Sequence, residues 1–119
     1  MKINFISQPK MKNIFLIFLL SVTTSLVYGQ TDTLVVKTSV ICNECKERIE
    51  HDLSFAKGVK QNTVNLETKE VTVIYNSEKT DPQKIRTAIT KIGYDADSLK
   101  ADQRAYNKLP QCCREPGHE

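Results

Sequence analysis

The chain has 119 residues, enough for one small domain, with 17 Lys and Arg against 14 Asp and Glu. Its formal net charge of +3 comes from Lys2, Lys10 and Lys12, because without residues 1–29 the chain carries 14 basic and 14 acidic residues. A neutral chain lacks the basic stripe that nucleic-acid binding requires. We therefore expect no nucleic-acid partner.

Residues 1–29 have the charged start, apolar block and polar exit of a secretory signal peptide, with Met11 as an alternative start. The apolar block IFLIFLL at 14–20 is shorter than the about 20 residues that span a bilayer. Cleavage would leave Gln30 as the first residue of a periplasmic or secreted protein. A retained membrane anchor is the alternative, but we expect a mature protein that does not span the membrane.

Four segments alternate apolar and polar side chains as strands do. The first covers residues 34–40. Runs at 64–66 and 71–75 flank the polar turn ETKE and predict a hairpin. A last short run at 94–99 is expected to complete one antiparallel sheet.

Two helices separate these strands. From Asn43 apolar residues recur at helical spacing, and Gly58 is expected to end that helix as its cap. A second helix begins at the N-cap Asp81 and ends at Gly93, and residues 101–109 are expected to form one or two further turns. The order β-α-β-β-α-β predicts an α+β fold, the ferredoxin-like sandwich with one antiparallel sheet and two helices on one face.

The four cysteines, Cys42, Cys45, Cys112 and Cys113, are the main candidates for chemistry. The first two form a C-x-x-C where a strand gives way to a helix, and free N–H groups there favour thiolates. Two thiolates suit a soft metal ion of low coordination number such as Cu(I) or Hg(II). Zn(II) normally takes four ligands, so it is an alternative that needs additional groups.

Two other functions use the same thiols. A thiol–disulfide oxidoreductase also carries C-x-x-C at a helix start, and an exported interaction module would use the cysteines as disulfide staples. A bridge within either pair closes too small a loop to stabilise much, so only cross-pairing would help. No Ser–His–Asp set, paired carboxylates or phosphate loop is evident, and we expect no enzyme activity.

Residues 34–96 resemble the heavy-metal-associated domain family, which includes copper metallochaperones, the N-terminal domains of metal-transporting P-type ATPases and the periplasmic mercury-binding protein. The shared motifs are C-x-x-C, a helix with spaced apolar residues, G-V, V-x-L, V-x-V-x-Y and A-I-x-x-x-G-Y. In this chain they are carried by Cys42, Cys45, Ile49, Leu53, Gly58, Val59, Val64, Leu66, Val71, Val73, Tyr75, Ala88, Ile89, Gly93 and Tyr94.

The resemblance implies that Cys42 and Cys45 are the metal ligands and that Tyr94 lies in a loop beside them. Together with the signal peptide, it implies an exported protein, here expected as a monomer, that captures a soft metal ion and hands it over. The partner would be a metal-transporting membrane protein or another metal-binding domain. The domain would occupy residues 30–99, followed by a C-terminal extension at 100–119.

The chain departs from the family pattern beside the first cysteine. The family's G-M-[TH] is replaced by Ser39-Val40-Ile41, which removes a buried methionine, and Glu44 adds a negative charge inside the motif. These changes leave the choice of ion open. The signal peptide favours the periplasmic mercury-binding type over cytosolic copper chaperones.

The extension holds Cys112, Cys113 and His118, which have no place in the family pattern. The short helix expected after the last strand has a narrow apolar edge. Together with a few extended residues, it is just long enough to span the length of one strand. We therefore expect Cys112 and Cys113 to return to the C-x-x-C end. There they would be auxiliary ligands, receive the ion in transfer, or form a disulfide.

Overall fold

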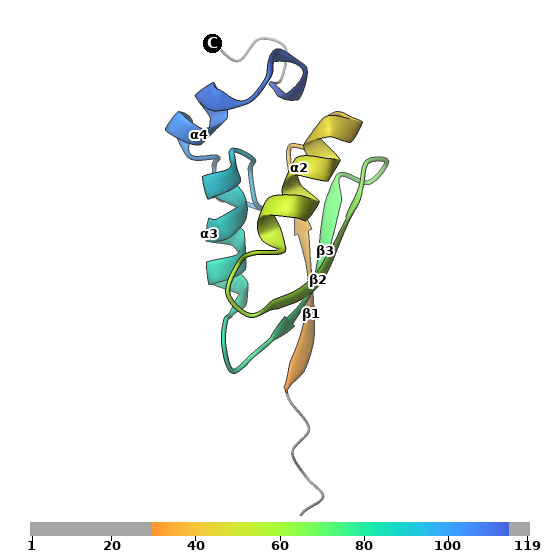
Figure 1. Cartoon of the computed structure of the whole chain (residues 1–119), viewed down its shortest axis with the longest axis vertical. Coiled ribbons are helices and arrows are strands. Elements are labelled where there is room, and N and C mark those ends of the chain that lie inside the picture. Colours follow the sequence, from red (N-terminus) through yellow and green to blue (C-terminus); the bar gives the residue numbers. More distant parts are fainter. Residues whose placement is uncertain (1–29, 115–119) are drawn as a thin grey trace, which may run out of the picture.

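A computed structural model describes residues 30–114, so the predicted signal peptide and His118 lie outside the described residues. Figure 1 shows α2 and α3 against one face of a single sheet. Among the described residues, no helix is both long and apolar enough to cross a membrane. The elements in chain order are β1 (Thr31–Lys37), α2 (Asn43–Leu53), β2 (Val59–Asn65), β3 (Glu70–Asn76), α3 (Pro82–Ile92), α4 (Gln103–Lys108) and the 3-10 turn η3 (Gln111–Cys113).

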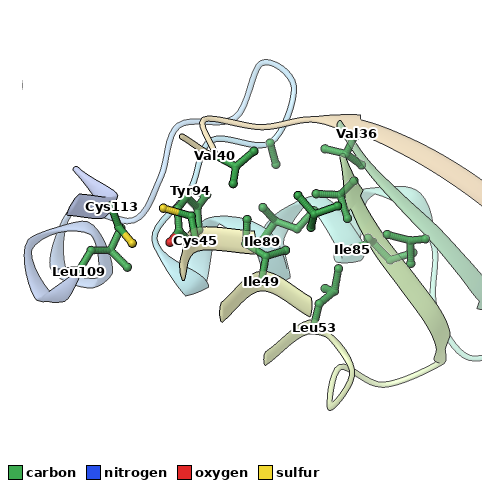
Figure 2. Close-up of a cluster of buried hydrophobic side chains, with 14 of the residues drawn as sticks. Val36, Val40, Cys45, Ile49, Leu53, Ile85, Ile89, Tyr94, Leu109 and Cys113 are labelled. Carbon is green, nitrogen blue, oxygen red and sulfur yellow. The ribbon is translucent and has the colours of Figure 1, made fainter. Parts of the chain in front are cut away.

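The sheet is antiparallel with the order β1-β3-β2, so β3 pairs with both neighbours. Val71, Val73 and Tyr75 of β3 are buried while Thr72 between them is exposed, as the period of two requires. Val36 of β1 lies opposite Val71 and is also fully buried. Each such aliphatic side chain stabilises the fold by about 1.5–3 kcal/mol through burial. The helices complete this core, labelled in part in Figure 2, with Ile49, Leu53, Ile85 and Ile89.

This arrangement confirms the predicted ferredoxin-like α+β fold, but the strands have different bounds. The first strand spans Thr31–Lys37 and not 34–40, because its pairing with β3 runs from Thr31 opposite Asn76 to Lys37 opposite Glu70. The second strand, Val59–Asn65, is longer than the predicted 64–66, since β3 offers a partner along its whole length.

The last predicted strand, 94–99, is reduced to isolated bridges that join Ala96 to Thr38 and to Leu99. The side chain of Asp97 explains the difference. One of its carboxylate oxygens accepts the Lys37 backbone N–H at 2.9 Å and the other accepts Arg86 Nε–H at 2.8 Å. Its backbone has φ 53°. A left-handed residue pinned in this way turns the chain instead of extending it.

The first helix ends at Leu53, five residues before the predicted Gly58 cap. Ser54 is the C-cap, and its hydroxyl donates to the His51 carbonyl at 2.5 Å. Gly58 instead takes its positive φ of 82° in the loop before β2, where its carbonyl accepts the Asn76 N–H. Gly58 therefore shapes the loop that leads into β2 and does not cap α2.

The second and third helices match their predictions more closely. Asp81 caps α3 by accepting the Lys84 N–H at 2.9 Å, and Gly93, with φ 121°, is its C-cap. The predicted helix at 101–109 appears as α4, one residue after its N-cap Asp102. Helix α4 packs against α3, which places the start of the extension on the helical layer.

Candidate metal centre

The C-x-x-C lies where the chain leaves β1 and enters α2. Val40, fully buried, anchors the connecting loop to the core at the position where the family pattern has methionine. Cys42 is the N-cap residue with extended backbone, and its carbonyl accepts the Lys46 N–H at 3.1 Å, the first bond of the helix. Cys45 follows in the first helical turn. The two sulfurs consequently converge, 2.9 Å apart.

The two thiols differ in exposure. Cys42 is half-buried, whereas Cys45 is completely buried and belongs to the core stripe of α2. Cys45 is therefore the more shielded of the two sulfurs. An ion between them would be reached from the side of Cys42 and retained from the side of Cys45.

The environment of Cys45 favours its thiolate. Burial opposes ionisation, but hydrogen bonds from the Cys113 and Cys42 thiols and the Tyr94 hydroxyl outweigh it, so the pKa of Cys45 is lowered. Burial raises the pKa of Tyr94 far above its ordinary value, and hydrogen bonding to Cys45 raises it further. Tyr94 thus stays a protonated donor beside the sulfur that ionises.

Tyr94 is almost completely buried, as predicted for the loop beside the motif. Figure 2 shows its hydroxyl next to the sulfur of Cys45. Among the described residues, this hydroxyl has no partner that meets hydrogen-bond geometry, although it lies close enough to the Cys45 and Cys113 sulfurs to interact with them. A buried donor of this kind is normally satisfied, and a metal-bound thiolate is an acceptor suited to it.

The C-terminal extension returns to this end of the molecule. Figure 1 shows α4 at the end of α3 and the segment that follows it near the N-terminal end of α2, and η3 contacts that helix. The Cys113 sulfur lies 3.7 Å from Cys42 Sγ, and the sulfurs of Cys42, Cys112 and Cys113 all lie within 4.8 Å of one another. The predicted return of the vicinal cysteines is therefore confirmed, while the metal-ligating role of all four cysteines stays a prediction.

The vicinal pair has one buried and one exposed member. Cys113 is 1% exposed, and burial raises the pKa of its thiol well above the ordinary value. Cys112 is exposed, and its thiol donates to Glu44 Oε2 at 3.1 Å. That hydrogen bond raises the pKa of Cys112 as well. Each thiol of the pair therefore holds its proton more tightly than Cys45 does.

The apolar edge expected to pack the extension along the domain is present at Leu109, but sequence reasoning did not identify the contacts that hold it. Leu109 is buried against Gly93, where an added Cβ would lie 3.1 Å from the leucine side chain. The Asp102 N–H donates to the Thr90 carbonyl, and Arg114 Nε–H donates to the Leu109 carbonyl at 3.0 Å. The contact between Glu44 and Cys112 was also missed, because residues 68 positions apart carry no local signal.

Comparison with known proteins agrees with this geometry. Residues 35–95 match the family described as the heavy-metal-associated domain. A copper-exporting P-type ATPase of Staphylococcus aureus strain MRSA252 is 45% identical over 67 residues, which are 56% of this chain. The matching region is only 8% of that ATPase, so the chain spans a small part of this relative.

Solved structures of similar shape include two small metal-binding proteins. A CopZ metallochaperone has a TM-score of 0.52 and 30% identity, covering 55% of this chain and 98% of its own. Oxidised MerP from Ralstonia metallidurans CH34 has a TM-score of 0.55 and 26% identity, covering 57% of this chain and 96% of its own. A little over half of this chain thus corresponds to nearly the whole of these neighbours.

Proposed function

The chain belongs to the heavy-metal-associated domain family, and we propose that it is an exported protein that captures a soft metal ion and hands it over. The ion, Cu(I) or Hg(II), is bound by Cys42 and Cys45. The observation that carries this proposal is the pair of unbridged sulfurs 2.9 Å apart at the N-terminus of α2. Thiolates are the ligands that such ions prefer.

The unequal burial of the two sulfurs supports an order in which they release the ion. Of the two C-x-x-C ligands, the half-buried Cys42 is the one that an incoming thiolate displaces first, and the buried Cys45 is released last. Each metal–sulfur bond that breaks is replaced by one to the acceptor, and each released thiolate takes up a proton from solvent. The acceptor that supplies the incoming thiolate is a metal-transporting membrane protein or a second metal-binding domain.

The chemistry of the site tests this proposal directly. A double Cys42→Ser, Cys45→Ser variant should lose affinity for Cu(I) by more than about a hundredfold, since changes outside the ligand shell already reduce affinity 10–100-fold. Competition with a Cu(I)-specific chromophoric chelator, with all thiols reduced, measures this. Asn43→Ser, inside the motif but with both thiols intact, is the matched control and should bind as wild type does.

Two results would contradict the proposal. The first is a double variant that binds Cu(I) and Hg(II) as tightly as wild type. The second is thiol–disulfide turnover in the absence of metal, which would indicate an oxidoreductase. Export is tested separately by N-terminal sequencing of the mature protein, which should begin at or near Gln30, whereas a membrane-bound protein that retains residues 14–20 would exclude cleavage.

A further inference from the structure

The described cysteines form a larger thiol cluster than the family motif alone provides. Cys42 Sγ is 2.9 Å from Cys45 Sγ and 3.7 Å from Cys113 Sγ, and Cys113 Sγ is 3.9 Å from Cys112 Sγ. Sulfurs that share one ion at about 2.3 Å lie roughly 3.8–4.0 Å apart in tetrahedral or trigonal geometry. The spacing of Cys113 from Cys42 fits such a shared ion, and so does its spacing from Cys112, so burial and hydrogen-bond partners must decide which further sulfurs share the ion.

Packing against the hydrophobic core fixes the position of Cys113. Leu109 and Cys113 are both buried members of the hydrophobic core that also contains Cys45 and Tyr94. Figure 2 shows the sulfur of Cys113 turned toward Cys45 and Tyr94. Backbone bonds within η3, from the Cys113 N–H to the Pro110 carbonyl at 2.9 Å, fix the turn that aims it.

Cys112 differs from its neighbour in direction and in partner. Adjacent residues of a 3-10 turn project about 120° apart, and Cys113 is accordingly buried while Cys112 is exposed, although their sulfurs lie 3.9 Å apart. The Cys112 thiol instead points to Glu44 at the surface. A fourth thiolate there would lie beside a carboxylate, and like charges at close range oppose each other.

We propose that Cys113 is the third ligand of the ion held by Cys42 and Cys45, which makes a three-thiolate site that excludes Cys112. The inference rests on the proposed function and deepens it. Binding requires the Cys42 and Cys45 sulfurs to part by roughly 1 Å to reach the shared-ion spacing. The three thiols release their protons as three metal–sulfur bonds form, and the Tyr94 hydroxyl donates to the bound sulfurs.

A third protein ligand changes what the site does. An acceptor's thiolate enters a two-coordinate ion through an open coordination position, and here Cys113 fills that position. The chain therefore holds its ion more tightly and transfers it more slowly than a C-x-x-C site alone. This describes a scavenger that retains the ion until an acceptor displaces the extension's sulfur.

The test uses the mature chain with reduced thiols, loaded separately with Cu(I) and Hg(II). X-ray absorption of the wild-type protein should give three sulfur ligands per ion, a readout that needs no variant. Cys113→Ser should leave two sulfurs and lower affinity by about tenfold or more, which is the effect expected for losing one of three ligands. The matched control, Cys112→Ser, should keep three sulfurs and change affinity by less than about threefold.

Two sulfurs in the wild type, or unchanged affinity in Cys113→Ser, would overturn the inference while leaving the proposed function intact. Four sulfurs, or equal losses in the two variants, would also overturn it in favour of a site that includes Cys112. Circular dichroism of each variant, and Cys113→Ala as a second substitution, separate a lost ligand from a lost fold. Failure of the proposed function would look different, because the wild type would bind neither ion or the double Cys42→Ser, Cys45→Ser variant would still bind.

Discussion

The two cysteine pairs reach the same end of the molecule by different physical routes. Cys42 and Cys45 are positioned locally, by the first turn of α2 and the loop that Val40 anchors. Cys112 and Cys113 are positioned by tertiary contacts, because α4 packs on α3 and η3 on α2. The first pair is therefore fixed as soon as the helix forms, while the second depends on the whole domain.

This difference predicts separable behaviour. A local pair should remain together whenever α2 is folded, whereas the vicinal pair should come away when the extension is undocked. The two regions also differ chemically, since the pKa is lowered at Cys45 and raised at Cys112 and Cys113. Four changes, taken from the largest expected effect to the smallest, test how independent the regions are.

Ile49→Ala should have the largest effect, because it removes a fully buried side chain of the shared hydrophobic core. A core substitution of this kind lowers the free energy of unfolding by about 2–5 kcal/mol. Chemical denaturation of the metal-free protein measures it. Phe55→Ala, at a side chain 77% exposed, is the control and should change stability by less than about 0.5 kcal/mol. Equal losses in the two variants would refute the assigned core.

Leu109→Ala should act on the extension alone. It removes the contact between the Leu109 side chain and Gly93. The free energy of unfolding should fall by about 2 kcal/mol, the low end for a buried leucine, because Leu109 lies at the edge of the core. The decisive readout is thiol alkylation resolved by peptide mass spectrometry. Cys113 should react at least about tenfold faster, since its protection comes from docking, while the rate at Cys45, which α2 still holds, should change by much less. The exposed neighbouring change Lys108→Ala should alter neither, and equal acceleration of both cysteines would show that the two regions unfold together.

The same contrast explains how much of the molecule the sequence could predict. The helix caps Asp81 and Gly93 and the buried position of Cys45 follow from local chemistry and periodicity, and the structure has them as expected. The last strand was wrong because Asp97 is held by Lys37 and Arg86, both distant in sequence. Local patterns record the propensity of a segment to extend but not the partners that bend it.

The candidate site divides in the same way. Its C-x-x-C could be recognised from spacing alone, and chain length was enough to show that Cys112 and Cys113 could return. Which of the two would be buried could not be predicted, because that depends on the 3-10 turn at η3 and the seat of Leu109. Neither feature has a signature in the residues that form it.

The pH dependence of metal binding should show whether Cys113 releases a proton when the ion binds. Burial raises the pKa of Cys113, so in the free protein at neutral pH this thiol is protonated and must lose its proton to bind. Affinity should therefore fall as pH falls, and its dependence should be steeper in wild type than in Cys113→Ser by about one proton per ion. Competition titrations between roughly pH 6 and 8 measure both slopes. Parallel slopes would mean that Cys113 does not ionise on binding, while Cys112→Ser should retain the wild-type slope.

Glu44→Gln should have the smallest effect and is the most selective test of docking. The Glu44 carboxylate accepts the Cys112 thiol at 3.1 Å and raises the pKa of Cys112, both by that hydrogen bond and by repelling the thiolate. Removing the charge lowers this pKa, so the reactive thiolate fraction at neutral pH grows. Iodoacetamide should then alkylate Cys112 a few-fold faster, with fold stability unchanged because both side chains are at the surface.

The matched control for that change is Glu47→Gln, an equally conservative substitution at an exposed position of the same helix. It removes the same charge from α2 without touching the Cys112 hydrogen bond, so it separates direct contact from the general field of the helix. Equal acceleration in the two variants would mean that Cys112 senses only net charge and that η3 does not dock as described. A faster reaction in Glu44→Gln alone, combined with protection of Cys113, requires a docked turn in which Cys113 is buried while Cys112 stays at the surface beside Glu44. That is the arrangement by which a segment outside the domain can add one sulfur to the site and keep the other in solvent.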